Sequence, residues 1–265
     1  MTTSDIAPPK DLKDCGALVV GGTAGIGLAT AVGLAEAGAP RVMIVGRSAE
    51  RGRAAQERIS SVNPSCAVTF LSADATTLDG AVYIASAAER ILGGVDILVS
   101  TTAPDVRPEL FANIPTDDIA RTFNQLALPS MYLASEIVPH MTARKGGVII
   151  NVASDAAKTA TPGESVIGAA KAAIVMFSRT LAIEAKRNGI RVNVLTPSLV
   201  NGTGSTERIT SDGFSAKLFA KAAQQAHLGV PESEDLAALA VFLTSPAARR
   251  LTGQAISVNG GISAA

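Results

Sequence analysis

Three glycines between a predicted strand and a predicted helix form the clearest binding pattern in the sequence. In ALVVGGTAGIGLATAVGLAEAG, Gly21, Gly25 and Gly27 separate a β-branched run from an Ala-rich helical stretch. Gly21 allows a tight exit from the strand, and the other two let the backbone approach a pyrophosphate at the helix N-terminus. The pattern predicts a dinucleotide site, which also includes Thr23 and Ile26. The alternative is a glycine-rich turn that serves packing only.

The residues after the second predicted strand indicate which dinucleotide binds. A carboxylate at position 46 would hold the ribose 2′-hydroxyl of NAD, but the sequence has Gly46 there. The next residue, Arg47, can pair with the 2′-phosphate of NADP. We therefore predict NADP as the cofactor in preference to NAD. The alternative is that Arg47 is a solvated residue at the start of a helix.

Short apolar runs alternate with longer helical stretches along the chain and define the elements that must position these residues. The predicted strands are 17–20, 42–45, 67–71, 97–100, 148–152, 191–195 and 255–258. The predicted helices are 25–38, 48–60, 78–92, 117–141 and 171–187. Strands that are apolar on both faces and are separated by helices indicate a parallel sheet covered on both sides. We predict a single doubly wound α/β domain of the Rossmann type, with a seven-stranded parallel sheet and helices on both faces.

One segment interrupts this alternation. The predicted domain spans 1–265 and begins with a tail at 1–12, and no linker divides it. Residues 198–227 follow a predicted strand, and their first half is rich in Gly, Ser and Thr. Ligands of such folds bind at the carboxyl ends of the strands, so we predict that 198–227 is a substrate lid. The alternative is an ordinary loop followed by a surface helix.

Composition excludes several classes of partner. The 23 basic and 23 acidic residues balance, so neither a nucleic-acid nor a membrane partner is indicated, and we expect a small-molecule substrate. Cys15 and Cys66 are too few for a disulfide framework. The N-terminus does not resemble a signal peptide, and no apolar run approaches the roughly 18 residues of a membrane span. We expect a cytoplasmic protein. His140 and His227 lack a second ligand at metal spacing, so no metal site is predicted.

The chain from 13 to 261 resembles the short-chain dehydrogenase/reductase family. The resemblance rests on the glycine spacing, on SADAT, on RVNVLTPS and on the C-terminal FLTSPAARRLTGQAISVNGG. It implies that Asp74 lies in an adenine-contacting turn, and it adds Ala75, Thr101 and Leu199 to the predicted cofactor site. It also implies a homo-tetramer or a homodimer, with pairing to a related subunit as a further option.

The resemblance identifies two catalytic residues and one replacement. Members of the family use an Asn, a Ser, a Tyr and a Lys, with the Tyr four residues before the Lys. Ser154 in IINVASDAA and Lys171 in GAAKAA match this pattern, and Lys171 also donates to the cofactor ribose in the family. Ile167 stands where the Tyr is expected. The Tyr supplies a proton to the substrate, and an isoleucine side chain has none to give.

The other departures from the family pattern concern the same pocket. The expected Asn aligns with Leu126, and Asn124 would fit only if the helix carried two extra residues. The usual Asn-Asn-Ala-Gly after the fourth strand reads STTA at 100–103. We infer that the function of this pocket differs from the one it has in the family. Glu164 or Asp155 could replace the Tyr as the acid if burial raises its pKa, and the alternative is that both are solvated loop carboxylates.

Three functions from different classes remain compatible with the sequence. The favoured one is an NADP-dependent oxidoreductase of the short-chain type that acts on a small carbonyl, alcohol or imine substrate. An iminium carbon accepts hydride to give a neutral amine, so that reaction needs no proton donor. The second is a catalytically silent subunit of a hetero-oligomer. The third is a non-redox enzyme that catalyses an elimination, addition or cyclisation on the same scaffold.

Overall fold

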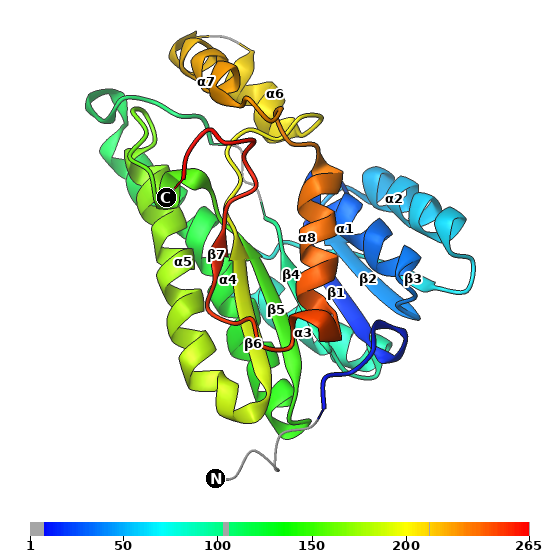
Figure 1. The fold of residues 1–265 in the computed structure, drawn as a ribbon. Helices are drawn as coiled ribbons and strands as arrows, with labels where there is room; N and C mark the ends of the chain where they lie inside the picture. Colours follow the sequence, from blue (N-terminus) through cyan, green and yellow to red (C-terminus); the bar gives the residue numbers. More distant parts are fainter. Residues whose placement is uncertain (1–7, 103–105, 212, 265) are drawn as a thin grey trace.

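A seven-stranded parallel sheet forms the centre of the computed structural model, which describes residues 8–102, 106–211 and 213–264 (Figure 1). The strands are β1 Gly16–Val20, β2 Arg41–Gly46, β3 Ala67–Ser72, β4 Ile97–Ser100, β5 Gly147–Val152, β6 Ile190–Leu195 and β7 Ala255–Ile256. Their order is β3-β2-β1-β4-β5-β6-β7. The prediction of a doubly wound sheet with seven parallel strands is confirmed. Strand β7 ends two residues before the predicted position, because only Ala255 and Ile256 pair with β6.

Helices cover both faces of this sheet. They are α1 Gly25–Glu36, α2 Ala49–Val62, α3 Leu78–Leu92, α4 Thr116–Ala143, α5 Ser165–Ala185, α6 Gly204–Thr210, α7 Gly213–Gln225 and α8 Ser233–Thr244. One face carries α1, α2 and α8, and the other carries α3, α4 and α5 (Figure 1). The predicted helices did not include α8, which is apolar around much of its surface and therefore shows little helical periodicity.

Alternate residues of the central strand β1 face opposite sides of the sheet. Val19 belongs to the same buried cluster as Leu34 of α1 and Leu236 of α8. Its neighbour Leu18 belongs to the second cluster, with Leu133 of α4. None of these five side chains is exposed to solvent. Burial on both faces explains why the strands read as continuous apolar runs and not as alternating ones.

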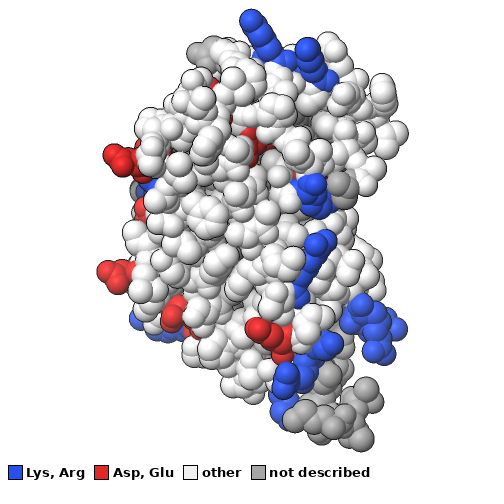
Figure 2. Space-filling view, turned by 90° about the vertical axis from the view of Figure 1, so that its left-hand side faces the viewer, with Lys and Arg blue, Asp and Glu red and all other residues white. Residues whose placement is uncertain are grey.

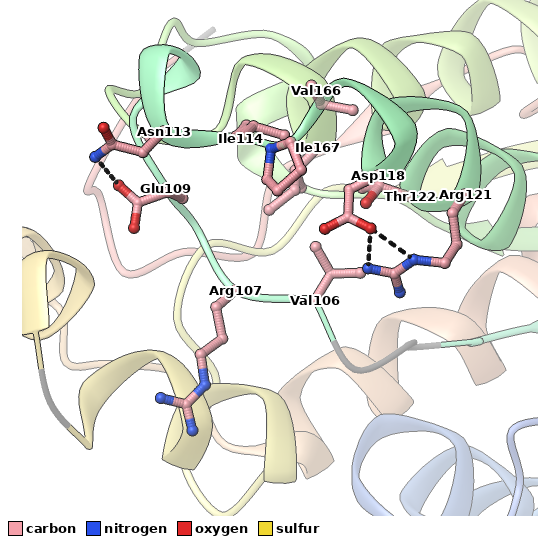
Figure 3. A pocket seen from close by; sticks show the side chains of 12 residues that line it. Val106, Arg107, Glu109, Asn113, Ile114, Asp118, Arg121, Thr122, Val166 and Ile167 are labelled. Carbon is pink, nitrogen blue, oxygen red and sulfur yellow. Dashed lines mark hydrogen bonds and ion pairs between the residues drawn. The ribbon is translucent and has the colours of Figure 1, made fainter.

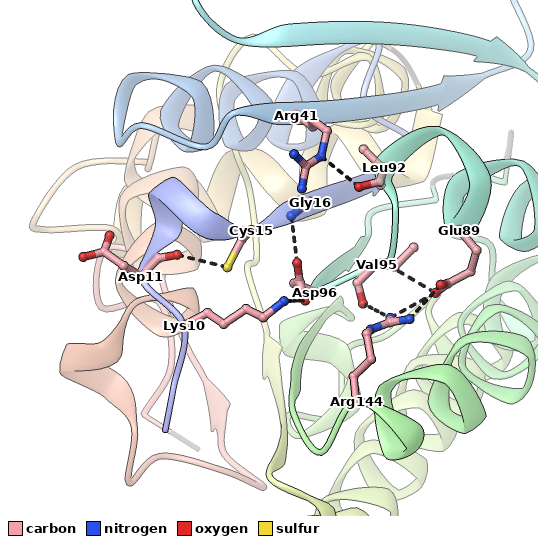
Figure 4. Close-up of polar contacts among 10 residues, drawn as sticks. All are labelled: Lys10, Asp11, Cys15, Gly16, Arg41, Glu89, Leu92, Val95, Asp96 and Arg144. Carbon is pink, nitrogen blue, oxygen red and sulfur yellow. Dashed lines mark hydrogen bonds and ion pairs between the residues drawn. The ribbon is translucent and has the colours of Figure 1, made fainter. Parts of the chain in front are cut away.

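The amino ends of the strands are joined by polar contacts at the edge shown in Figure 4. The Asp96 carboxylate accepts hydrogen bonds from the backbone N–H of Gly16 at 3.0 Å and from Nζ of Lys10 at 2.6 Å. Arg144, which follows α4, donates to the Glu89 carboxylate of α3 at 2.8 Å. These contacts link the starts of β1 and β4 to each other, and α3 to the end of α4.

The end of the predicted N-terminal tail packs against the domain. Lys10 forms the ion pair with Asp96, and Leu12 is buried at the start of the short 3-10 helix η2, Leu12–Asp14. Burial of one apolar side chain and one ion pair is enough to fix this part of the segment. Residues 1–7 of the tail lie outside the described residues.

The predicted lid segment 198–227 contains α6 and α7, which lie beyond the carboxyl ends of the strands (Figure 1). Phe219 of α7 is buried, whereas Phe214 is 39% exposed. Position 212 lies outside the described residues. The segment is therefore more helical than its Gly-, Ser- and Thr-rich first half indicates, because Thr203 caps α6 by accepting a hydrogen bond from the backbone of Thr206.

Within the described residues, one helical stretch, Ser165–Asn188, is long and apolar enough to cross a membrane by length and composition alone. A search for uninterrupted apolar runs does not detect it, because polar residues such as Lys171 lie within it. In this fold one side of the stretch contacts α4 and β6.

We predict that Asp96→Ala lowers the free energy of unfolding by about 1–3 kcal/mol, because it leaves the buried N–H of Gly16 without an acceptor. The matched variant Lys10→Ala removes only the ion pair, whose lysine is 51% exposed, and should cost less than about 1 kcal/mol. Urea unfolding of the two variants compares these losses. Equal losses would show that the Gly16 contact contributes nothing.

Candidate active site and cofactor site

The loop between β1 and α1 has the backbone geometry expected of a dinucleotide loop. Gly21 and Gly25 have φ angles of 82° and 51°, a region that favours glycine. Gly27 has a packing role that the sequence analysis did not assign to it. A Cβ atom there would collide with the carbonyl oxygen of Gly21 and lie 2.5 Å from Oγ1 of Thr101. Gly27 therefore lets α1 approach the end of β4 closely.

The first turn of α1 is open to an anion. Its N-cap residue, Ala24, makes no side-chain hydrogen bond to the helix. The first backbone N–H groups of α1 therefore have no side-chain cap, and the positive end of the helix dipole adds to their attraction for an anion. A pyrophosphate fits this arrangement. Of the other two residues predicted for this site, Thr23 precedes α1, and Ile26 lies in its first turn and packs against the first buried cluster.

The side chain of Thr23 occupies the space beside position 46 at the end of β2. A Cβ atom at Gly46 would lie 2.7 Å from both Cγ2 and Oγ1 of Thr23, so a carboxylate at this position would displace Thr23. Arg47 is exposed, and its charge acts on Asp74. Burial opposes ionisation of Asp74, but two hydrogen bonds from Thr76 and the charge of Arg47 outweigh this effect and lower the pKa of Asp74.

The remaining predicted cofactor residues follow the carboxyl ends of β3, β4 and β6 and therefore lie at the same edge of the sheet. Ala75 and Leu199 are buried, and Thr101 donates from Oγ1 to the carbonyl oxygen of Val20 at 2.9 Å. Position 103, the last of the STTA stretch, lies outside the described residues. A Cβ atom at Gly25 would lie 3.2 Å from Cγ2 of Thr203, which places the start of α6 against the glycine loop.

Ser154 follows β5 and caps the short 3-10 helix η4, Asp155–Ala157, by accepting a hydrogen bond from the backbone of Ala156 at 3.2 Å. Asp155 is buried and donates its backbone N–H to the carbonyl oxygen of Pro197 at 2.7 Å. Its carboxylate accepts a hydrogen bond from Ser263 at 2.5 Å. Asp155 is therefore a buried structural carboxylate and not the solvated loop residue that was one of the two sequence interpretations.

Lys171 lies buried on α5 and points back to the end of β5. Its Nζ donates to the carbonyl oxygen of Val152 at 3.4 Å. Burial lowers the pKa of Lys171 to about 8, and the charge of Glu164 partly offsets this effect. Val152 lies two residues before Ser154, so the fold brings the two predicted catalytic residues to the same strand end.

Glu164 is the N-cap residue of α5 and is half-buried. Burial raises the pKa of Glu164 to about 7, and the charge of Asp155 adds to the rise, whereas Lys171 and a hydrogen bond with Thr161 oppose it. Lys171 and Glu164 thus influence each other's charge at one strand end. The raised pKa meets the condition under which the sequence analysis considered Glu164 as an acid.

Ile167 lies in an apolar contact between α4 and α5. It packs against a small buried cluster that contains Leu126, Ala127 and Ala170. Asn124, the alternative candidate for the family Asn, is exposed on α4. Leu126, and not Asn124, is therefore the candidate that belongs to the cluster around Ile167.

The two tyrosines of the chain lie elsewhere. Tyr83 of α3 is 54% exposed. Tyr132 of α4 packs against the second buried cluster, which includes Leu133 and lies under α3 and α4. Neither tyrosine belongs to the cluster around Ile167.

A cavity of about 230 Å³ lies between the 106–115 segment and the first turns of α4 and α5 (Figure 3). Ile167, Val166 and Ile114 line it with hydrocarbon, and Asp118 forms an ion pair across one side with Arg121 at 2.9 Å. The cavity reaches Ile167, but Ser154 and Lys171 are not among its lining residues.

Known proteins share both the sequence pattern and the fold. A family model described as enoyl-(acyl carrier protein) reductase matches residues 20–263. Gluconate 5-dehydrogenase of Gluconobacter oxydans is 32% identical over 95% of each chain. The structure of L-sorbose reductase from Gluconobacter frateurii, complexed with NADPH and L-sorbose, has a TM-score of 0.83 and 30% identity over 96% of this chain and 98% of that one.

A second solved structure extends the likeness to another cofactor and substrate. A 7α-hydroxysteroid dehydrogenase complexed with NADH and 7-oxo glycochenodeoxycholic acid has a TM-score of 0.85 and 27% identity over 98% of each chain. These matches show that the chain belongs to the short-chain dehydrogenase/reductase family of NAD(P)-dependent oxidoreductases. The family resemblance stated from the sequence is confirmed.

We predict that Gly27→Ala lowers the free energy of unfolding by about 1–3 kcal/mol, because the added Cβ forces α1 away from Gly21 and Thr101. The same exchange at Gly33, also on α1, meets only a methyl group of Val241 at 3.1 Å. Gly33→Ala should be neutral or stabilise by up to about 1 kcal/mol, because alanine favours the helix. Thermal and urea unfolding measure both. Equal stability of the two variants would contradict the close contact.

Proposed function

We propose that this protein is an NADP-dependent oxidoreductase that acts on a small carbonyl, alcohol or imine substrate. The observation that carries the proposal is the uncapped first turn of α1 beside Gly21 and Gly25, at the sheet edge where Ser154 and Lys171 also lie. A nicotinamide cofactor bound there would supply or accept hydride at a substrate carbon. The same edge holds the substrate in open α/β folds.

The choice of NADP rests on the end of β2. Gly46 cannot carry a carboxylate without displacing Thr23, so the group that would bind the 2′-hydroxyl of NAD is missing. The exposed guanidinium of Arg47 supplies positive charge at the next residue. The solved relatives include complexes with NADPH and with NADH, so the family leaves either nucleotide open. The local charge favours the 2′-phosphate.

Of the four catalytic residues of the family, we assign the Ser and the Lys to this chain and infer that the Tyr and the Asn are replaced. Ser154 binds the reacting oxygen of the substrate through its hydroxyl, and Lys171 donates to the cofactor ribose. We infer that the family Tyr is absent from this site, with Ile167 in its place, and that Leu126 replaces the Asn. The contact of Ile167 with the Leu126 cluster supports this inference, as does the finding that neither tyrosine belongs to that cluster.

The exposed face of α5 supports a homo-oligomer. Met176 and Ile183 of this helix are each 60% exposed. Figure 2 views the molecule from the side on which α5 lies in Figure 1, and uncharged side chains dominate the centre of that face. A second copy of the chain would remove this apolar surface from water. An intact relative that pairs through the same face is the alternative partner.

We predict that Arg47→Ala weakens NADPH binding by about 10- to 100-fold, the value of a lost charge-assisted hydrogen bond, and leaves NADH binding unchanged. Arg58→Ala, an exposed arginine near the end of α2, is the control and should change neither affinity. Fluorescence titration of both reduced nucleotides measures the effect. Tighter binding of NADH than of NADPH by the unmodified protein would contradict the assignment of NADP as the cofactor.

We predict that Ile167→Tyr creates or raises ketone reductase activity, because it places a phenol four residues before Lys171. General acid catalysis adds about 10²- to 10⁴-fold to the rate of a site that lacks an acid, which is the upper bound of the gain. Ile167→Phe has the same ring without the hydroxyl and should show no gain. NADPH oxidation with L-sorbose and other ketones is the assay. A correctly folded Tyr variant that remains at the Phe level would show that the pocket has diverged beyond this residue.

A further inference from the structure

The first turns of α5 lie directly on the segment that carries Ser154. A Cβ atom at Gly168 would lie 2.8 Å from the carbonyl oxygen of Ala156 in η4, so only glycine lets the two segments approach this closely. Glu164 lies one turn before Gly168, and its carbonyl oxygen accepts the Gly168 N–H at 2.5 Å. Lys171 lies one turn after Gly168. Residues at this spacing share one helix face, which places the Glu164 side chain on the side of Ser154 and Lys171.

The turn that leads into Glu164 is covered from two further directions. Gly163 has a φ angle of 86°, and a Cβ atom there would lie 2.7 Å from Cε1 of Phe214 in α7. The carbonyl oxygen of Gly163 accepts a hydrogen bond from the backbone N–H of Glu109 at 2.8 Å. Phe214 of the predicted lid segment and the backbone of Glu109 before α4 therefore both contact the turn that leads into α5.

The charged groups near the Glu164 carboxyl have opposite effects on its ionisation. Asp155 of η4 disfavours its ionisation, and Lys171 of α5 favours it. The carboxylate of Glu109, on the loop that contacts Gly163, accepts a hydrogen bond from Nδ2 of Asn113 at 2.9 Å (Figure 3). Burial and Asp155 together prevail over Lys171 and Thr161 and raise the pKa of Glu164 to about 7. A carboxyl with this pKa can both give and take a proton near neutral pH.

We propose that Glu164 is the proton donor and acceptor of this enzyme, in place of the tyrosine that the family has at position 167. In reduction, hydride adds to the carbonyl carbon and the C=O π electrons move to oxygen. That oxygen takes the proton of the Glu164 carboxyl, and the carboxylate recovers a proton from solvent. In oxidation the carboxylate takes the alcohol proton as hydride leaves. The inference rests on the proposed function and adds the group that moves the proton.

The hydrocarbon at position 167 is consistent with this assignment. Ile167 lies three residues after Glu164 and therefore on a neighbouring part of the same helix surface. It packs against the small buried cluster that contains Leu126, which places hydrocarbon beside this part of α5. An apolar neighbour favours the protonated carboxyl over the carboxylate, whereas a tyrosine hydroxyl would solvate the carboxylate.

A direct titration tests the state of the carboxyl without any substrate or cofactor. Carbon NMR of protein labelled at the glutamate carboxyl carbons should show one signal that titrates near pH 7, against an ordinary value of 4.5. Glu164→Gln should remove that signal, and Lys171→Met should shift its midpoint to higher pH by removing the favourable positive charge. A Glu164 signal that titrates near 4.5 in the folded protein would overturn the proposal.

Kinetics then separate this proposal from the proposed function. Glu164→Gln should reduce NADPH-dependent ketone reduction by about 10²- to 10⁴-fold and leave reduction of a cyclic iminium substrate unchanged, because that step needs no proton. The unmodified protein should lose ketone reduction as pH rises through about 7, since only the protonated carboxyl donates. Glu184→Gln, an exposed carboxylate on the same helix, is the matched control and should match the unmodified protein.

Three further outcomes would each contradict a different part of these proposals. Full ketone reduction by Glu164→Gln, with an active unmodified protein, overturns the role of Glu164 and leaves the proposed function intact. A loss that is equal for ketone and iminium substrates assigns Glu164 to substrate binding and also overturns its role as the acid. An unmodified protein that oxidises NADPH with neither substrate overturns the proposed function itself.

Discussion

Burial of a parallel sheet on both faces is the constraint on which the other features of this protein depend. Because every strand runs in the same direction, all carboxyl ends meet at one edge, and the amino ends meet at the other. The amino edge is tied by structural contacts, such as those of Asp96 with Gly16 and Lys10. The carboxyl edge is left to loops, so residues far apart in the chain, such as Gly21, Ser154 and Leu199, converge there.

Glycine determines how closely the elements at this edge approach one another. Gly27 lets the first turn of α1 contact Gly21 and Thr101, and Gly168 lets α5 contact Ala156. The first contact positions the uncapped backbone N–H groups of α1, where we propose that the pyrophosphate binds. The second brings the helix that carries Lys171 and Glu164 against the segment that carries Ser154. Both contacts depend on backbone atoms that cannot move aside, unlike a flexible side chain.

The pKa values at the site depend on the close contact of Gly168 with Ala156. Close packing removes water from Lys171 and Glu164 together, which lowers the pKa of the amine and raises that of the carboxyl. Each group favours the charged form of the other, so neither shift is as large as burial alone would produce. A site of this kind can hold a proton near neutral pH without a phenol. The predicted lid segment contributes Phe214, which contacts the turn before Glu164.

The sequence alone determined the fold class, because continuous apolar strands that alternate with helices have one common solution, the doubly wound sheet. It also located the glycine loop and the matches at Ser154 and Lys171, because these patterns are local or keep fixed spacings. It did not reveal α8, whose apolar surface lacks a clear period, or the packing role of Gly27. Only the tertiary structure distinguished Glu164 and Asp155 from solvated loop residues. Burial and the charges of neighbours from other elements set a carboxyl pKa, and neither is a property of the local sequence.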